Sequence, residues 1–130
     1  MNRKSVRNAM RNEINLKALR PLIDNEDKTV TEVEKFQNEV LRPILKFQHS
    51  LFEIEVINNP LIEKLLRQEL TAERKRILVK GIISKTELKY QLLGQITGLL
   101  TNNEYLFYTK NKKEVDKRIF SMSLDRILSI

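Results

Sequence analysis

The sequence has 130 residues, of which 41% are hydrophobic and 32% are charged, and its formal net charge is +7. This composition excludes a disordered chain and suits one domain built around one hydrophobic core. Cysteine is absent, which excludes a disulfide framework, a thiolate metal site and a cysteine nucleophile. Three glycines and three prolines are too few turn formers for a sandwich or a barrel.

The N-terminal part is predicted to be a basic arm and loop over residues 1–28, followed by a single helical domain over residues 29–130. Six basic side chains and one acidic side chain lie in the first 20 residues. Val6, Met10 and Ile14 are four residues apart, which permits a short amphipathic helix. The arm lacks the apolar segment of a signal peptide, and the apolar stretch "YQLLGQITGLL" is too short for a membrane span. We therefore expect a cytoplasmic protein.

A long helix is predicted next, over about residues 31–57. Thr31 followed by Glu34 is typical of a capping box, in which two side chains bind free backbone N–H groups of the first turn. The apolar residues that follow are spaced three or four apart, as one face of a helix requires. They are Val33, Phe36, Val40, Ile44, Phe47, Leu51 and Ile54, and Leu41, Leu45 and Phe52 widen this stripe at its margin.

Pro43 lies near the middle of this helix. Proline has no backbone N–H, and its ring crowds the carbonyl group of Glu39. A complete break would reset the spacing of the apolar residues, but the spacing continues, so the sequence predicts a kink with no loop between residues 39 and 47. The kink either fits the helix to the core or creates a site that uses Gln37 or Gln48.

Further helix-start signals recur at short intervals and predict an all-α fold, a compact bundle of five or six helices. These signals are Asn59 with Pro60, Thr71, Ser84 with Glu87, Thr101 with Glu104, and Asn111 with Glu114.

Two groups of residues are candidate sites. Gly94 and Gly98 form a G-x-x-x-G pattern on a predicted helix, which indicates close helix packing or, together with Pro43, the wall of a pocket. The basic residues that could contact nucleic-acid phosphates are Arg3, Lys4, Arg7, Arg11, Arg74, Lys75 and Arg76. Aromatic residues that stack on bases are missing beside Arg74–Arg76, apart from Tyr90, so a solvated basic face is the alternative.

Neither catalytic, cofactor-binding nor metal-binding residues are predicted. His49 is the only histidine, and with Glu53 it forms an i, i+4 pair on the charged face of the long helix. A nitrogen-rich metal site needs further histidines, and the di-metal motif of helix bundles needs a glutamate where Lys46 stands. We therefore expect an exposed histidine and no cofactor.

Three segments resemble a family of small uncharacterised all-helical bacterial proteins, some of which carry the label glyoxalase. These segments are "EKFQNEVLRPILKFQ", "LLGQITGLLTNNEYLFYTKN" and "NKKEVDKRIFSM", and the resemblance covers roughly residues 34–128. Glyoxalases hold a metal with histidine and glutamate on a paired βαβββ scaffold. This sequence has one histidine and no strand pattern, so the resemblance implies the helical fold and leaves the label unsupported.

Three functions remain open from the sequence. The first is a non-enzymatic interaction or regulatory module whose partner is another protein or a second copy in a homodimer. The second is a nucleic-acid-binding protein that uses the basic arm and Arg74–Arg76. The third is an enzyme or small-ligand binder with a pocket between helices near Gly94, Gly98 and Pro43, where Glu39 could serve.

Overall fold

The computed structural model of the chain describes residues 13–22 and 31–130, and this part is helical without strands. The elements are α2 (Glu13–Ala18), α3 (Glu32–Phe36), the π-helical turn η1 (Gln37–Leu41), α4 (Arg42–Ile57), α5 (Pro60–Arg67), α6 (Ala72–Ser84), α7 (Leu88–Thr97), α8 (Asn102–Lys110) and α9 (Lys112–Leu128). Because α3, η1 and α4 form one continuous helix, the described residues contain seven helices. The all-α prediction is confirmed, and α2 is the helix beyond the predicted five or six.

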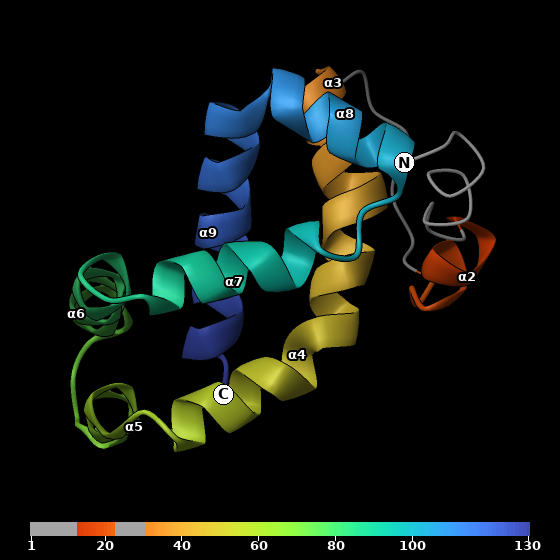
Figure 1. Ribbon diagram of the computed structural model, residues 1–130. Helices are drawn as coiled ribbons and strands as arrows, with labels where there is room; N and C mark the ends of the chain where they lie inside the picture. The colour runs from red at the N-terminus through yellow and green to blue at the C-terminus, as the bar shows by residue number, and fades with distance from the viewer. Residues whose placement is uncertain (1–12, 23–30) are drawn as a thin grey trace.

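The two longest helices form the sides of the fold. Figure 1 shows the long helix and α9 along two sides, with α7 crossing between them, α8 across one end, and α5 and α6 at the other. The C-terminal part of the long helix turns toward α5 (Figure 1). Every one of these helices therefore presents one face to a shared interior.

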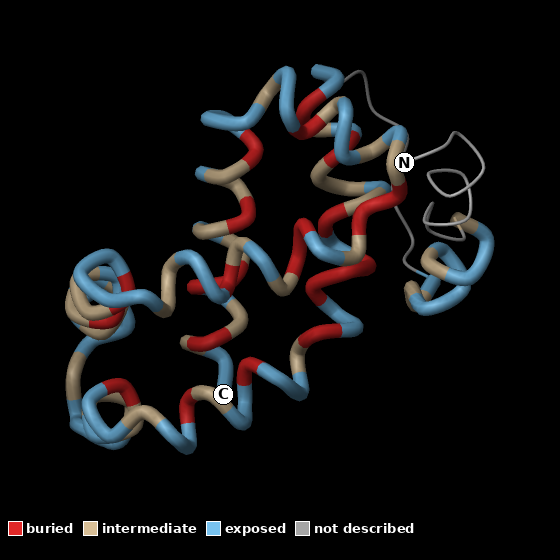
Figure 2. The backbone as a smooth tube through the Cα atoms, in the orientation of Figure 1, coloured by how far each residue is buried: buried red, intermediate tan, exposed pale blue. Residues whose placement is uncertain are grey.

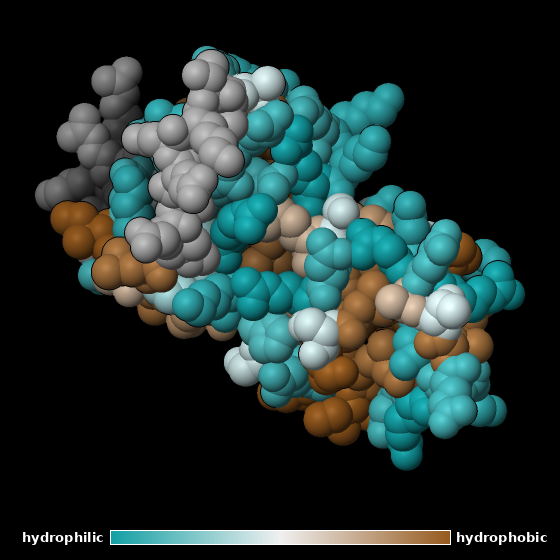
Figure 3. Space-filling model, turned by 180° about the vertical axis from the view of Figure 1, so that it is seen from behind, coloured by the Kyte–Doolittle hydropathy of each residue, from teal (hydrophilic) through white to brown (hydrophobic). Residues whose placement is uncertain are grey.

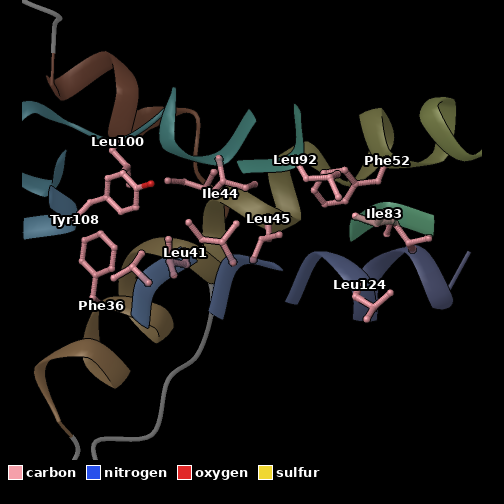
Figure 4. Packing of buried hydrophobic residues seen from close by; sticks show 14 of the residues in the cluster. Phe36, Leu41, Ile44, Leu45, Phe52, Ile83, Leu92, Leu100, Tyr108 and Leu124 are labelled. Atoms are coloured by element: carbon pink, nitrogen blue, oxygen red, sulfur yellow. The ribbon is translucent and has the colours of Figure 1, made fainter. Parts of the chain in front are cut away.

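The hydrophobic core fills the space between the long helix, α7 and α9. Figure 2 shows buried backbone on the inward sides of these helices and exposed backbone on their outward sides. Leu41 and Leu45 lie at the centre of the packed row in Figure 4, between Phe36 with Tyr108 at one end and Phe52 at the other. Both leucines are fully buried, so the middle of the long helix holds the bundle together.

Four of the predicted helix starts are confirmed, because the side chain at each accepts a hydrogen bond from a backbone N–H in the first turn. They are Thr31, Asn59, Thr71 and Thr101. Thr101 and Glu104 complete both halves of a capping box. Asn59 is followed by Pro60 as the first helical residue.

The predicted start at Ser84 is wrong, whereas the start at Asn111 is in the predicted place but lacks the expected side-chain cap. Ser84 is the last residue of α6, and its hydroxyl donates to the Lys80 carbonyl oxygen at 2.7 Å, while α7 begins later, at Leu88. Asn111 precedes α9, but its side chain donates backward to the Phe107 carbonyl oxygen at 3.0 Å. Both side chains bind back to a carbonyl group of the preceding helix, and residue types alone do not show whether such a side chain binds forward or backward.

The long helix passes Pro43 without a loop, as predicted, and the irregularity takes the form of a π-turn. The backbone N–H of Arg42 donates to the Gln37 carbonyl oxygen, five residues earlier. This wider turn immediately precedes Pro43, which donates no bond and crowds the carbonyl group four residues before it. A π-turn is therefore the way this helix accommodates its proline.

The π-turn also rotates the core-facing side of the helix, and the predicted stripe is wrong at Phe47, Leu51 and Ile54, which are exposed. From the end of the turn onward, the buried residues are Leu41, Pro43, Ile44, Leu45, Gln48, Phe52 and Val56. Most of them lie one position after a predicted core residue. The extra residue in the π-turn turns all later side chains by about 100°, the rotation per residue of an α-helix. The buried residues Phe36 and Leu41 are five apart across the turn. Because Val40 beside Leu41 is also apolar, a spacing of threes and fours could still be followed through this segment of the sequence.

Candidate functional site

The rotated helix leaves an apolar stripe on the surface. Phe47, Leu51 and Ile54, called the outer stripe below, are 42%, 40% and 55% exposed. Ile57 at the end of α4 and Leu61 in the first turn of α5 are exposed as well. Figure 3 shows hydrophobic side chains gathered over the end of the molecule where α4 and α5 lie. Apolar side chains that follow one helical face in water are typical of a surface that binds another protein.

Two opposite charges border the outer stripe. Lys46 and Glu53 are seven residues apart, close to two helical turns, so they lie along the same edge of α4. Lys46 is exposed. The Glu53 carboxylate is 3.2 Å from His49 Nε2 and its side chain is 52% exposed. His49 is partly buried rather than exposed as expected. The edge of the stripe thus carries one positive and one negative charge.

A polar groove lies on another side of the molecule, between the π-turn and α9. One hollow of about 420 Å³ is lined by Gln37, Arg42, Glu114, Lys117, Arg118, Ser121, Met122 and Asp125. A second hollow of about 300 Å³ is lined by Arg42, Met122, Asp125, Arg126 and Ser129. Three shared residues join the two hollows, and both together are called the α9 groove below.

Hydrogen bonds hold the walls of the α9 groove together. Arg118 donates to Gln37 Oε1 at 2.7 Å and to Glu114 Oε1 at 3.1 Å. Arg42 Nε donates to Asn38 Oδ1 at 3.0 Å, one turn back along the long helix. Because π-turns recur at functional sites, a polar groove beside one is a reasonable place for a ligand. Gln37, the residue that the sequence suggested for a site at the kink, lies in its wall.

A third hollow, of about 410 Å³, lies beside Pro43 itself. Its lining residues are Lys17, Arg20, Pro21, Leu22, Glu39, Val40, Pro43 and Glu104. Pro43 and Glu39 thus line a hollow, as the third functional hypothesis expected, but Gly94 and Gly98 are not among its lining residues. Glu39 is exposed, so water surrounds its carboxylate.

The carboxylate of Glu104 in this hollow is already bound. Arg20 donates to both of its oxygen atoms, at 2.8 and 2.5 Å, and to the Leu99 carbonyl oxygen at 3.0 Å. Burial alone would raise the pKa of Glu104, but the hydrogen bonds from Arg20 and Thr101 and the charge of Arg20 lower it below its usual value. Glu104 is therefore ionised and paired, which suits an anchor for the segment after α2 rather than proton transfer.

The predicted nucleic-acid residues do not form one patch in the described structure. Arg74 is exposed, Lys75 Nζ donates to the Leu66 carbonyl oxygen at 3.0 Å, and Arg76 pairs with Asp125 on α9. Arg74 is thus exposed to water, while Lys75 and Arg76 contact two different segments of the chain. The remaining predicted contacts lie outside the described residues: Arg3, Lys4, Arg7 and Arg11.

The two glycines of the G-x-x-x-G pattern do not mark a close helix crossing. Gly94 is exposed, and a Cβ atom added there would meet no other atom within 4 Å. Gly98 follows the last residue of α7, and a Cβ atom there would lie 2.8 Å from the Gly94 carbonyl oxygen. The prediction of close helix packing is wrong for Gly94, whereas Gly98 is needed for the tight end of its own helix.

Comparison with known proteins adds no assignment: no family model, curated protein or solved structure matches the chain. Among the described residues, no cluster of three or more histidine, cysteine, aspartate or glutamate side chains could hold a metal ion. No helix in this part of the chain has the length and apolar character to cross a membrane.

Proposed function

We propose that this chain is a non-enzymatic protein-interaction module whose docking surface is the outer stripe and whose partner is a second copy of the chain. The observation that supports this proposal is the exposure of Phe47, Leu51 and Ile54 on one face of a well-packed helix. A fold that has a full core and still leaves such a stripe in water gains free energy when a second apolar surface covers it.

An antiparallel, two-fold pairing of α4 helices fits the order of residues along the stripe. With the axis near residue 50, Phe47 of one copy lies opposite Ile54 of the other, and Leu51 lies beside its own symmetry mate. At 1.5 Å rise per residue, these pairs are level to within about 3 Å. A two-fold interface must complement itself in this way, since both copies offer the same residues.

The charges at the edge of the outer stripe are complementary in the same arrangement. In an antiparallel helix pair, the same edge of each helix meets across the axis. Lys46 of one copy then lies near Glu53 of the other, and the reverse pair forms by symmetry. Parallel pairing about a two-fold axis would instead place the same edge of the two helices on opposite sides of the interface, so Lys46 and Glu53 would not face each other across it. The charge pattern therefore favours the antiparallel dimer and its register.

The carboxylates beside Pro43 support a non-enzymatic role. General acid–base catalysis needs a titratable group that is available to a reacting molecule and adjusted to the working pH. Glu104 is held by Arg20 with a lowered pKa, and Glu39 faces water. Neither residue is arranged as a catalytic acid or base.

Charge reversal at the stripe edge tests the proposal. We expect the wild-type chain to be a dimer at micromolar concentration by sedimentation velocity. Lys46→Glu alone, or Glu53→Lys alone, places like charges at both symmetry-related contacts and should shift the chain toward monomer. The double variant restores opposite charges and should restore the dimer. Leu51→Glu places a charge on the axis and should abolish association.

Lys64→Glu on α5 serves as the matched control, since Lys64 is exposed and lies away from the stripe. It should leave the dimer intact. A monomeric wild-type chain would reject the second copy as the partner. A dimer that persists in Leu51→Glu would show that the chain associates through another surface.

A further inference from the structure

The α9 groove, which the proposed dimer leaves uncovered, carries an excess of unpaired positive charge. Its basic residues are Arg42, Lys117, Arg118 and Arg126, and its acidic residues are Glu114 and Asp125. The balance within the groove depends on which of these charges already have partners.

Both carboxylates of the groove are already paired. Glu114 accepts a hydrogen bond from Arg118 at 3.1 Å, and Asp125 pairs with Arg76, which reaches across from α6. Arg76 also donates to Ser121 Oγ at 3.2 Å. The acidic side chains therefore neutralise Arg118 and Arg76 and leave the other cations of the groove unbalanced.

Three cations remain without an acidic partner in the part of the chain that the structure describes. The Arg42 guanidinium donates through Nε to Asn38, a neutral side chain, and its terminal nitrogen atoms stay available. Lys117 and Arg126 form no side-chain ion pair with the described residues. A groove with three unbalanced cations attracts anions, because the walls that surround it reduce screening by water.

The spacing of these cations indicates an elongated anion. Lys117 lines the first hollow and Arg126 the second. They are nine residues apart on α9, which corresponds to about 13 Å along the helix and about half a turn around it, so they reach the groove from its two edges. Arg42 lines both hollows and faces α9 from the long helix. A single small anion cannot contact charges so far apart. A ligand with several linked anionic groups can.

The residue types favour phosphoryl groups. Arginine presents planar pairs of N–H donors that match the oxygen atoms of phosphate. Two of the three unbalanced cations are arginines, and serine hydroxyls at Ser121 and Ser129 line the same groove. Each hollow, at about 420 and 300 Å³, is of the size that small ligands occupy in proteins.

We propose that the α9 groove binds a linear chain of linked phosphates, with Arg42, Lys117 and Arg126 as the contacts. The site is independent of the proposed dimer. Arg42 and Phe47 are five residues apart, which turns them about 140° from each other around the long helix. A variant that loses the dimer should therefore still bind phosphate, and a variant that loses phosphate binding should still form the dimer.

Isothermal titration calorimetry with short-chain inorganic polyphosphate, which is long enough to reach all three cations, tests the site on the full chain. We expect binding at low salt that weakens as salt rises, because contacts with exposed phosphate charges are screened. The double variant Arg42→Gln/Arg126→Gln should bind about tenfold more weakly or worse, the effect of losing one or two charge-assisted hydrogen bonds. The double control Lys64→Gln/Lys110→Gln removes the same charge from α5 and α8 and should bind as wild type.

Three results would overturn the proposal. One is the absence of binding heat for the short-chain polyphosphate at low salt. Another is an equal loss in the groove variant and in the control, which would show attraction to net charge alone. The third is tighter binding of a single-stranded oligonucleotide that the groove variant loses, which would identify a nucleic-acid surface instead. If the double variant unfolds, Lys117→Gln replaces it, since this exposed side chain contributes little to the fold, and an unchanged affinity there would equally count against the site.

Discussion

The rotation of the core face by the π-turn can be tested with two identical substitutions on one helix. Leu45 and Leu51 are both leucines of α4, but Leu45 is fully buried, whereas Leu51 is 40% exposed. The repeating pattern of the sequence placed Leu51 at the core and Leu45 at its margin. In the structure Leu45 contributes more to the core than Leu51, so alanine at position 45 should lower the unfolding free energy much more than alanine at position 51.

The expected costs follow from burial. Leu45→Ala removes a side chain from a closed interior and leaves a cavity, which costs about 3 kcal/mol or more of unfolding free energy. Leu51→Ala loses only the burial of about 60% of a side chain whose full burial is worth roughly 2 kcal/mol. Water fills the space that this substitution leaves, so no cavity penalty is added. The expected cost is about 1 kcal/mol.

Urea unfolding followed by far-UV circular dichroism measures both values. The measurement belongs in the Lys46→Glu background, which we expect to be monomeric, because association would add the free energy of the interface to the Leu51 result. Equal slopes of the unfolding transitions would show that the two variants can be compared directly. Equal costs for the two alanine variants, or a larger cost at Leu51, would refute the rotated core face.

Three further predictions concern single positions. Pro43→Ala should lower the unfolding free energy by about 0.5–1 kcal/mol, because alanine makes the unfolded chain more flexible. We expect no compensating gain, since the π-turn already removes the clash between the proline ring and the helix backbone. A gain of about 2 kcal/mol in urea unfolding would show that the clash remains. Gly94→Ala should raise the thermal midpoint, since alanine stabilises an exposed helix position by about 1 kcal/mol relative to glycine. Gly98→Ala should lower the midpoint, because its Cβ atom would lie 2.8 Å from a backbone oxygen. The opposite order of the two midpoints would contradict the observed end of α7. The pKa of Glu104 is lowered, so its ionised form stabilises the fold above its ordinary pKa of 4.5, and this contribution disappears as the pH falls through the lowered pKa. The unfolding free energy of the wild type should therefore fall more steeply in acid than that of Glu104→Gln. Parallel pH curves for the two proteins would exclude the Arg20 anchor.

Most of the architecture could be predicted from local chemistry. Caps such as Thr101 with Glu104 act within one turn, so residue types at short spacing identify them, and the all-α fold follows. The expected cap does not form when a side chain binds backward, as those of Ser84 and Asn111 do, because the local sequence is compatible with either direction. At Asn111 the helix still begins in the predicted place.

The candidate sites were harder to predict because they depend on one extra residue in a helical turn and on distant pairs. A continuous spacing of apolar residues is compatible with both an α-turn and a π-turn before Pro43, and only packing selects between them. The α9 groove joins Gln37 to Arg118, which are 81 residues apart. Proline in a helix indicated where the irregularity lies, but no local pattern indicated that the apolar face would turn outward.

A single introduced cysteine tests the pairing of α4 helices most directly, because the chain has no cysteine of its own. Ser50 is exposed and lies close to the proposed two-fold axis, whereas Thr109 is exposed on α8, away from it. Under mild oxidation, Ser50→Cys should form a disulfide-linked dimer on a non-reducing gel much faster than Thr109→Cys at the same concentration. Equal, slow rates of cross-linking at the two positions would contradict a dimer built on the outer stripe.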